Sequence, residues 1–157
     1  MIVVRCLKLK ADARLPRAAH PGDAGLDLFA AEACVIAAGQ WRRVGTGIAV
    51  ELPAGMEGQV RPRSGLAWKY GVTVLNAPGT VDCGYRGEVQ VILINHGDSD
   101  FRVEKGMRIA QMVIRQVEQA RLECVERLNP SDRGGGGFGS SGIREFSVQA
   151  DGPTTAD

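Results

Sequence analysis

The sequence predicts an all-β sandwich or barrel, and three observations support this. Residues 107–114 alternate with a period of two and carry apolar side chains on both faces, as a core strand does. Residues 89–94 form an almost continuous apolar run, which is typical of a buried strand. Glycine accounts for 21 of the 157 residues, and Gly and Pro recur at the short intervals that separate strands in such folds.

Two further elements are predicted from local patterns. Residues 1–10 alternate apolar and basic side chains over their second half, which predicts a first strand. The only helix expected is short. Ser64 can cap its start, and Gly71 is the kind of residue that ends a helix.

The composition divides the chain into one domain and an arm. A length of 157 residues fits a single domain, and the strand patterns lie in residues 1–130. From residue 131 the chain reads SDRGGGGFGSSG and later ADGPTTAD, which lacks the apolar side chains that a core needs. We therefore expect a β domain over residues 1–130 and a flexible arm over residues 131–157.

Charge and cysteine spacing argue against several classes of function. Nineteen basic and eighteen acidic residues leave a formal net charge of +1, too little for general attraction to nucleic acids or membranes. No apolar run reaches the length of about 18 residues that predicts a membrane span. Residues 1–10 do not resemble a secretory signal. The four cysteines are scattered without a C-x-x-C pair, so we expect reduced thiols, no zinc site and a cytoplasmic protein.

The glycine-rich segment at residues 133–142 is either a plain flexible tail or part of a phosphate-binding site. Arg133, Phe138, Ser140 and Ser141 stand among glycines, a mixture that can lay a cation, an aromatic face and backbone N–H groups over a planar phosphorylated ligand. The run also satisfies G-x-G-x-x-G. No strand precedes it, however, and too little chain follows for a dinucleotide-binding βαβ unit.

The turn at residues 62–65 is a second candidate phosphate site. Arg63 offers a guanidinium and Ser64 a hydroxyl at the predicted helix start, while Gly65 lets a ligand approach the backbone. The alternative is an ordinary capped turn with a solvated arginine.

Residues 76–95 contain more residues with special conformational or chemical properties than a turn in solvent needs. Pro78 and Gly79 predict the turn of a hairpin. Asp82 follows between two apolar residues, where it is either a backbone acceptor in a turn or a carboxylate that orients and deprotonates water. Tyr85 is either a packing residue beside glycine or part of a binding pocket.

Four isolated polar residues are weaker candidates. Asp27 lies between two leucines at the start of a strand, where a buried acid satisfied by backbone donors is the simplest interpretation. Gln111 interrupts an apolar strand and needs hydrogen-bond partners in any case. His20 and His96 lie in loop contexts and are expected on the surface, which disfavours a Ser-His-Asp or Cys-His device.

Taken in order, these segments resemble the five motifs of the homotrimeric deoxyuridine triphosphatases (dUTP pyrophosphatases, dUTPases). The match spans most of the chain, and five motifs in the right order at compatible spacing form a specific signal. The matching segments are AGLDL at 24–28, PRSGLAWKYGV at 62–72, NAPGTVDCGYRGE at 76–88, MRIAQMVI at 107–114 and RGGGGFGSSG at 133–142.

The resemblance implies a distorted, jelly-roll-like β-barrel subunit over residues 1–130, assembled as a homotrimer. Each of three active sites would be built from all three chains. One chain would supply the nucleoside pocket and a neighbour the phosphate-binding motifs. The third would supply the arm at residues 131–157, which closes the site as a lid. The implied reaction is hydrolysis of dUTP to dUMP and pyrophosphate, which limits uracil incorporation into DNA and supplies dUMP for thymidylate synthesis.

The resemblance also assigns roles to residues. Asp82 is expected to activate the water that attacks the α-phosphorus. Asn76 should pair with uracil, Tyr85 should lie under the deoxyribose, and Phe138 should stack on the base. The other expected contacts are Thr80, Val81 and Gln90 in the nucleoside pocket, Arg63, Ser64, Gly65 and Gln111 at the phosphates, and Arg133, Gly139, Ser140 and Ser141 in the arm.

Mg²⁺ is the expected cofactor, because it neutralises and orients a triphosphate while binding mainly substrate oxygens and water. No cluster of carboxylates in the sequence marks a dedicated metal site. Asp27 is expected only to support the site, by bracing Tyr85 or an ordered water. Ala77 and the pair at 83–84 depart from the family pattern without affecting these expectations.

Two other functions fit parts of the pattern. A deoxycytidine triphosphate deaminase shares the fold and the trimer, but deamination typically needs a glutamate beside the cytosine. A binding module without activity would use the glycine-rich arm for a regulatory partner or for RNA. One arginine beside the glycines and a net charge of +1 make a poor RNA-binding tail.

Overall fold

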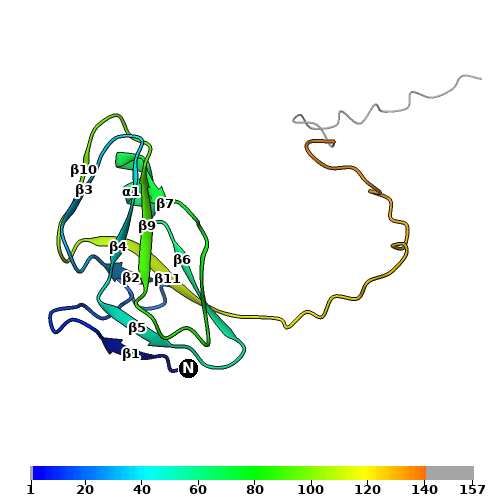
Figure 1. Cartoon of the computed structure of the whole chain (residues 1–157), viewed down its shortest axis with the longest axis horizontal. Coiled ribbons are helices and arrows are strands. Elements are labelled where there is room, and N and C mark those ends of the chain that lie inside the picture. Colours follow the sequence, from blue (N-terminus) through cyan, green and yellow to red (C-terminus); the bar gives the residue numbers. More distant parts are fainter. Residues whose placement is uncertain (1, 141–157) are drawn as a thin grey trace, which may run out of the picture. The chain divides into compact units, whose positions relative to one another are not determined.

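The computed structural model describes residues 2–140, and the body of the chain is built from β-strands (Figure 1). Among the described residues there is one helix, α1 (Ser64–Tyr70). The strands are β1 (Arg5–Lys8), β2 (Leu26–Phe29), β3 (Cys34–Ile36), β4 (Trp41–Gly45), β5 (Ile48–Glu51), β6 (Met56–Arg61), β7 (Val72–Val74), β8 (Gly79–Asp82), β9 (Gln90–Asn95), β10 (Phe101–Val103) and β11 (Arg108–Gln116).

The strands pair antiparallel in four small sheets. The largest has the order β2-β11-β6-β8, and a three-stranded sheet has the order β4-β9-β7. β1 pairs with β5, and β10 pairs with β3. Neighbours in the largest sheet are far apart in sequence, as expected of a jelly-roll-like fold. The predicted all-β, jelly-roll-like class is confirmed.

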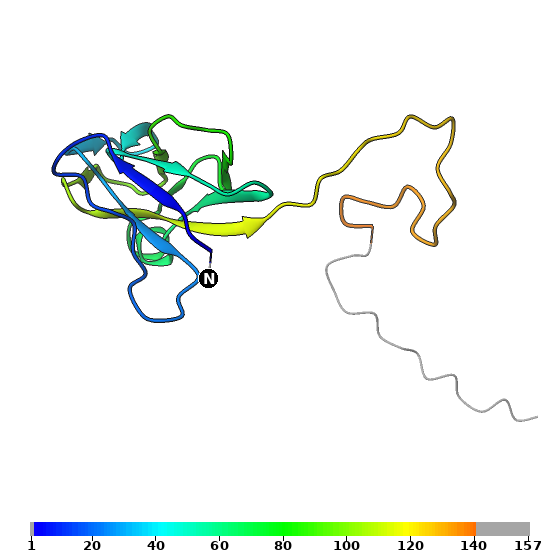
Figure 2. The ribbon, with the colours of Figure 1, turned by 90° about the horizontal axis from the view of Figure 1, so that it is seen from below.

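All four sheets contribute to one hydrophobic core. One residue from each sheet is at most 1% exposed and belongs to the same cluster: Leu28 of β2, Leu93 of β9, Ile48 of β5 and Val103 of β10. The two segments with the strongest sequence patterns became β9 and β11, as predicted. Figure 2 shows the long strand β11 (yellow) crossing the body and the loop before β2 (blue) projecting from it.

The helix forms where predicted, but its cap was predicted wrongly. Arg63, not Ser64, is the N-cap residue, and it makes no side-chain capping hydrogen bond. Its extended backbone places its carbonyl where the N–H groups of Leu66 and Ala67 donate to it, while its guanidinium points elsewhere. Gly71 ends the helix with a positive φ of 65°, as expected.

The hairpin predicted around Pro78 and Gly79 is also wrong. The strand before it, β7, pairs with β9, and the strand after it, β8, pairs with β6. The turn therefore passes the chain from one sheet to another instead of joining neighbours. Val74 and Val81, on either side of the turn, are both buried in the common core. That shared burial requires the chain to cross between the sheets at this point.

The chain separates into two compact units, residues 1–120 and 121–157. Between residues 121 and 140 the described part of the second unit contains turns but no helix or strand. Its backbone hydrogen bonds are local, running from Gly134 to Ser131, from Gly136 to Arg133 and from Ser140 to Gly137. The boundary expected at residues 130 and 131 stays a prediction.

Within the described residues, no helix is long and apolar enough to cross a membrane. All four cysteines lie in this part of the chain, and none is bonded to another. Cys6 and Cys34 are partly covered by the β-sheets, whereas Cys124 is exposed. Burial raises the pKa of the Cys6 and Cys34 thiols.

We expect Cys6 and Cys34 to react with iodoacetamide at neutral pH more slowly than Cys124. A raised pKa lowers the thiolate fraction, and the thiolate is the form that reacts. Peptide mass spectrometry over a time course measures the individual rates. Equal rates at all three positions under native conditions would contradict the packing described here.

Candidate active site

One face of the large sheet carries a row of polar side chains across three strands. Gln111 of β11 stands opposite Asp27 of β2 on one side and opposite Arg61 of β6 on the other. Residues in register across a sheet point to the same face. This register brings together residues that are up to 84 positions apart in the sequence.

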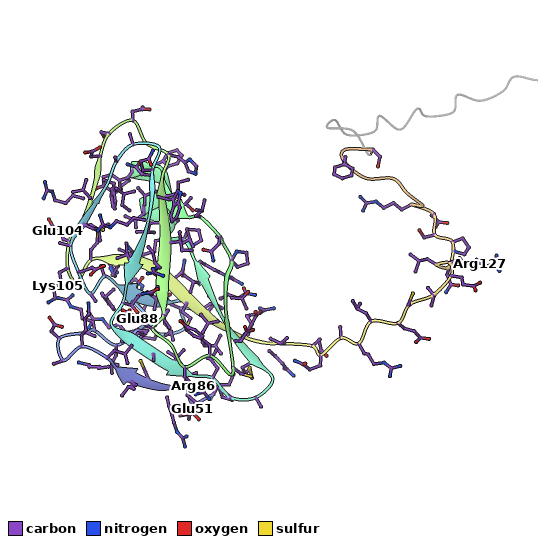
Figure 3. All side chains as sticks on the ribbon, in the orientation of Figure 1. Glu51, Arg86, Glu88, Glu104, Lys105 and Arg127 are labelled. Atoms are coloured by element: carbon purple, nitrogen blue, oxygen red, sulfur yellow. The ribbon has the colours of Figure 1, made fainter. Side chains whose placement is uncertain are left out.

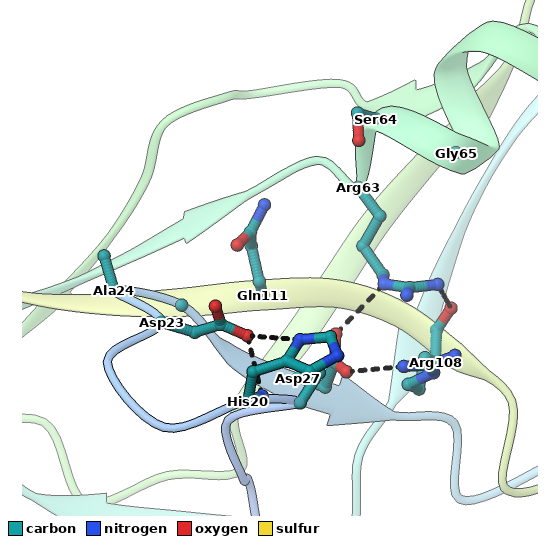
Figure 4. A pocket seen from close by; sticks show the side chains of 11 residues that line it. His20, Asp23, Ala24, Asp27, Arg63, Ser64, Gly65, Arg108 and Gln111 are labelled. Atoms are coloured by element: carbon teal, nitrogen blue, oxygen red, sulfur yellow. Dashed lines mark hydrogen bonds and ion pairs between the residues drawn. The ribbon is translucent and has the colours of Figure 1, made fainter.

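Asp27 is the best-buried member of this row, with 8% of its surface exposed. Arg63 Nε donates to its Oδ1 at 3.0 Å, and Arg108 Nη1 donates to its Oδ2 at 3.1 Å (Figure 4). The expectation that backbone donors satisfy this carboxylate was wrong. Two guanidinium groups bind it, and a buried carboxylate paired in this way holds both cations in position.

Gln111 stands beside this cluster with its amide fixed. Its Nε2 donates to the carbonyl of Pro62 at 2.9 Å. Gly25 leaves the space that the amide oxygen fills, because a Cβ at that position would lie 2.0 Å from Gln111 Oε1. The Gln111 amide therefore has the hydrogen-bond partner that it needs, and this partner belongs to the turn at residues 62–65 that carries the candidate phosphate-binding residues.

We expect Gly25→Ala to displace the Gln111 amide and to break its hydrogen bond to Pro62. One such bond contributes about 1 kcal/mol, so we expect a rise in KM of roughly fivefold with little change in kcat. Gly84→Ala is the matched control, because nothing lies within 4 Å of its added Cβ. An unchanged KM in Gly25→Ala would argue against a substrate role for Gln111.

These residues line a cavity of about 440 Å³. Figure 4 shows Arg63 and Gln111 on the same side of β11, with Ser64 and Gly65 at the start of α1 above them. Every phosphate-binding residue expected in residues 24–114 borders this cavity, namely Arg63, Ser64, Gly65 and Gln111, with Asp27 beneath them. Cationic and hydroxyl donors around one cavity make it a candidate anion site.

A second cavity, of about 210 Å³, opens between β8 and β9. Four residues expected at the nucleoside and the expected general base line it: Thr80, Val81, Tyr85 and Gln90, with Asp82. Val81 is buried, whereas Asp82 is exposed. Asn76 is not among the residues that line this cavity within one chain.

Glu88 organises one wall of the second cavity. Its Oε1 accepts from the backbone N–H of Gly47 at 2.7 Å, and its Oε2 accepts from Gln90 Nε2 at 3.0 Å. Its carbonyl accepts from the hydroxyl of Tyr85 at 3.0 Å. Gly87 permits this position of the tyrosine, because a Cβ there would lie 2.4 Å from the hydroxyl oxygen.

Arg86 ties the loop after Asp82 to the body of the domain. Its Nη1 donates to the carbonyls of Cys83 and Tyr85, at 2.6 and 3.0 Å. Its Nη2 lies 3.9 Å from a carboxylate oxygen of Glu51, and the two side chains are neighbours in Figure 3. Arg86 therefore links the carbonyls of the loop that carries Tyr85 to Glu51 of β5.

The two cavities lie at opposite ends of the large sheet. Gln111 pairs with Arg61 at the end of β6, while Asp82 pairs with Glu57, four residues earlier on the same strand. Four residues of strand and two strand spacings separate the Cα atoms of Gln111 and Asp82 by roughly 16 Å. A single chain thus holds the carboxylate away from its own anion site.

The described arm residues offer exposed groups. Phe138 has a positive φ of 47°, and its side chain is fully exposed. Arg133 Nε donates to the carbonyl of Gly136 at 2.9 Å, and Ser140 ends the described chain in a turn. Gly139, with φ 88°, follows the aromatic ring. Ser141 lies outside the described residues.

The comparisons with known proteins agree with the geometry. The family model described as dUTPase matches residues 11–142. This chain belongs to the dUTPase family. It is 58% identical over 145 residues to the deoxyuridine 5'-triphosphate nucleotidohydrolase of Clostridium acetobutylicum, covering 92% of this chain and 100% of that protein. The protein of the same description from Clostridioides difficile is 54% identical over 143 residues, which is 91% of this chain and 100% of the relative.

Solved structures of dUTPases share the fold. A variant of the Staphylococcus bacteriophage 80alpha dUTPase with dUpNHpp matches at a TM-score of 0.83 and 30% identity, over 90% of this chain and 99% of that one. A mutant of the dUTPase of phage phi11 of S. aureus, whose structure reveals the coordination of a structural Mg(II) ion, matches at a TM-score of 0.75 and 24% identity. The shares covered are 82% of this chain and 99% of the phage chain.

Sequence reasoning missed several residues that border the two cavities of this dUTPase, among them Arg108, Glu88 and Arg43. Arg108 shares Asp27 with Arg63, and Glu88 and Arg43 line the second cavity. The sequence contained a weak indication of Arg108, because this cation begins the same predicted strand that carries the candidate residue Gln111. In the described part of the chain, no three His, Cys, Asp or Glu side chains gather as a metal site would require. His20 and His96 are exposed, as predicted.

Proposed function

We propose that this dUTPase-family protein hydrolyses dUTP to dUMP and pyrophosphate by attack of water on the α-phosphorus. The observation that carries the proposal is the different chemistry of the side chains that line the two cavities. One gathers Arg63, Ser64 and Gln111 around an anion site, and the other holds Asp82 and Tyr85 at a narrow pocket. A triphosphate fits the first, and a nucleoside fits the second.

The nucleoside pocket selects deoxyuridine by its size. Thr80 and Val81 form its wall. Asn76, which does not line the cavity of a single chain, would pair with the uracil edge together with neighbouring backbone and leave no room for the methyl group of thymine. Tyr85 lies under the deoxyribose and excludes a ribose 2′-hydroxyl. Its position is supported by the hydrogen bond to the Glu88 carbonyl, and Gln90 is held by the carboxylate of the same residue.

The phosphate pocket holds the triphosphate by charge-assisted hydrogen bonds. Arg63 and Ser64 donate to phosphate oxygens, Gly65 allows close approach of the backbone, and Gln111 adds an amide. Asp27 contributes by fixing Arg63 and Arg108, so their guanidinium groups are ordered before substrate arrives. Such preordering lowers the entropic cost of binding and of reaching the transition state.

Asp82 is the proposed general base. Its carboxylate orients a water molecule and takes a proton as the water oxygen attacks the α-phosphorus. The bond from the α-phosphorus to the bridging oxygen then breaks, and pyrophosphate leaves with that oxygen. The side chain of Asp82 is exposed and makes no hydrogen bond within residues 2–140, so it is free to accept one from water.

Mg²⁺ fits this site through the substrate and not through a protein cage. The side chains that line the phosphate cavity are mainly donors, and its two carboxylates, Asp23 and Asp27, are paired with His20 and with arginines. Phosphate oxygens and water would therefore supply most ligands. The ion would neutralise charge on the triphosphate and orient the phosphates.

A homotrimer with shared sites is part of the proposal. The separation of roughly 16 Å between Gln111 and Asp82 in one chain supports it, because a base must reach the attacked phosphorus through a single water. A neighbouring chain would bring its Arg63 and Gln111 to this chain's Asp82. The arm of a third chain would cover the substrate, with Phe138 stacked on uracil and Arg133, Ser140 and Ser141 at the terminal phosphate.

Pyrophosphate release with dUTP, dTTP, dCTP and UTP in the presence of magnesium tests the proposed function. We expect dUTP alone to be consumed at an appreciable rate, with dUMP as the second product. Release of ammonia from dCTP would instead identify a deaminase. Selective hydrolysis of dUTP would keep uracil out of DNA and supply dUMP for thymidylate synthesis, and we place this role in the cytoplasm.

A further inference from the structure

A third cavity lies next to the phosphate cavity and is lined by three arginines. Its volume is about 840 Å³, and Arg14, Arg17 and Arg108 border it together with Phe29 and Gly106. Arg14 and Arg17 belong to the segment between β1 and β2. The proposed hydrolysis of dUTP uses neither residue.

The cavity concentrates positive charge in a chain that is otherwise nearly neutral. It is lined by three guanidinium groups and one carboxylate, that of Asp27. The formal charge of its lining is therefore +2, whereas the formal net charge of the whole chain is +1. Asp27 is already shared by Arg63 and Arg108. Across residues 2–140, neither Arg14 nor Arg17 has a carboxylate within salt-bridge distance, so no acidic side chain of the described residues neutralises them.

Two of the arginines are held in place without an acid. The guanidinium carbons of Arg14 and Arg17 lie 5.6 and 5.9 Å from the centre of the Phe29 ring. Arg14 Nη1 also donates to the carbonyl of Gly106 at 3.2 Å. A Cβ on Gly106 would lie 3.0 Å from the guanidinium carbon, so glycine permits this close approach. The cations are therefore ordered before any ligand binds.

The geometry favours an inorganic ligand over a second nucleotide. Phe29 is 4% exposed and has two guanidinium groups over its ring, so it offers no surface on which a base could stack. Guanidinium groups pair with phosphate oxygens in a bidentate manner. Three of them around one cavity suit an anion that carries several such oxygens.

Arg108 connects this cavity to the phosphate cavity. It stands opposite Phe29 in the register of β11 and β2, and its side chain borders both cavities. One nitrogen is bound to Asp27, while 48% of the side chain is exposed. Arg108 is therefore the one arginine that the two cavities share, whereas Arg14 and Arg17 border only the third cavity.

We propose that the cavity formed by Arg14, Arg17 and Arg108 is a second anion site that takes inorganic pyrophosphate while the nucleotide site is occupied. The existence of the site rests on the geometry of the three arginines. The choice of pyrophosphate, the leaving group, rests on the proposed function.

Calorimetric titration of the full chain with inorganic pyrophosphate tests this site without turnover. The nucleotide site is first saturated with a non-hydrolysable dUTP analogue. We expect one pyrophosphate to bind per chain, and Arg17→Gln or Arg14→Gln to weaken it about tenfold, since each removes charge-assisted hydrogen bonds. Arg42→Gln, an exposed arginine of β4 without an ion pair in residues 2–140, is the matched control and should bind like the parent protein.

Absence of pyrophosphate binding, or binding in both arginine variants as tight as in the parent protein, would overturn the inference. Uptake of a second equivalent of the nucleotide analogue in place of pyrophosphate would also overturn it. Thermal melting of each variant shows whether it is folded. Pyrophosphate binding without dUTP hydrolysis would leave the site standing and refute the proposed function. Hydrolysis of dUTP without pyrophosphate binding would support the proposed function and refute the second anion site.

Discussion

Replacing Asp82 by Asn is expected to lower kcat for dUTP by roughly 10²–10⁴-fold, while a non-hydrolysable dUTP analogue still binds with similar affinity. Asn keeps the shape of the side chain but cannot take a proton from water. Asp82 is exposed at the end of β8, so the substitution should leave the fold intact. Steady-state hydrolysis and calorimetric binding measure the two effects separately.

Asp98→Asn is the matched control for this experiment. Asp98 is an exposed carboxylate in the loop after β9 and borders neither of the two cavities of the proposed active site. It should retain the parent rate. Parent-like turnover in Asp82→Asn would remove the general base from the proposed mechanism. A loss confined to binding would reassign Asp82 to substrate recognition.

Ending the chain at Asp132 is expected to lower kcat/KM by about 10²-fold or more, because it removes the phosphate donors proposed in the arm. The stability of the body should hardly change. All residues of the hydrophobic core cluster precede residue 120, so the truncation removes none of them. Hydrolysis rates, melting temperature and sedimentation of the truncated protein measure activity, stability and assembly.

A chain that ends at Gly142 is the control for the arm. It keeps Arg133, Phe138 and both serines and loses only residues 143–157, which match no part of the family pattern. We expect it to behave like the full chain. A truncation at Asp132 that unfolds, or that keeps full activity, would contradict the role of the arm as a lid over the substrate.

Local sequence patterns predicted those parts of the fold that depend on residues close together in the sequence. The alternation in residues 107–114 and the apolar run at 89–94 gave two core strands, and Gly71 gave the helix end. The cap at Ser64 was wrong because a distant interaction decides the geometry. Arg63 extends its side chain to Asp27, 36 residues away, and its own carbonyl receives the first helical N–H groups.

The candidate site shows the same limit. Gln111 and Asp27 were found because a polar residue in an apolar strand is conspicuous. Arg108 and Glu88 were missed, since an arginine or a glutamate at a strand edge is ordinary in sequence. Only the register of β11 against β2, and the approach of Gly47 to Glu88, give these two residues their contacts. Sequence spacing does not encode such pairings.

Mixing two inactive variants tests most directly whether the base and the phosphate pocket come from different chains. Asp82→Asn and Arg63→Gln are each nearly inactive in the proposed mechanism. Chains unfolded and refolded together should form mixed trimers in which about one quarter of the sites combine an intact Asp82 with an intact Arg63. Recovery of about that fraction of the parent activity is the predicted result. No recovery, with mixed assemblies demonstrated by native mass spectrometry, would contradict the shared site.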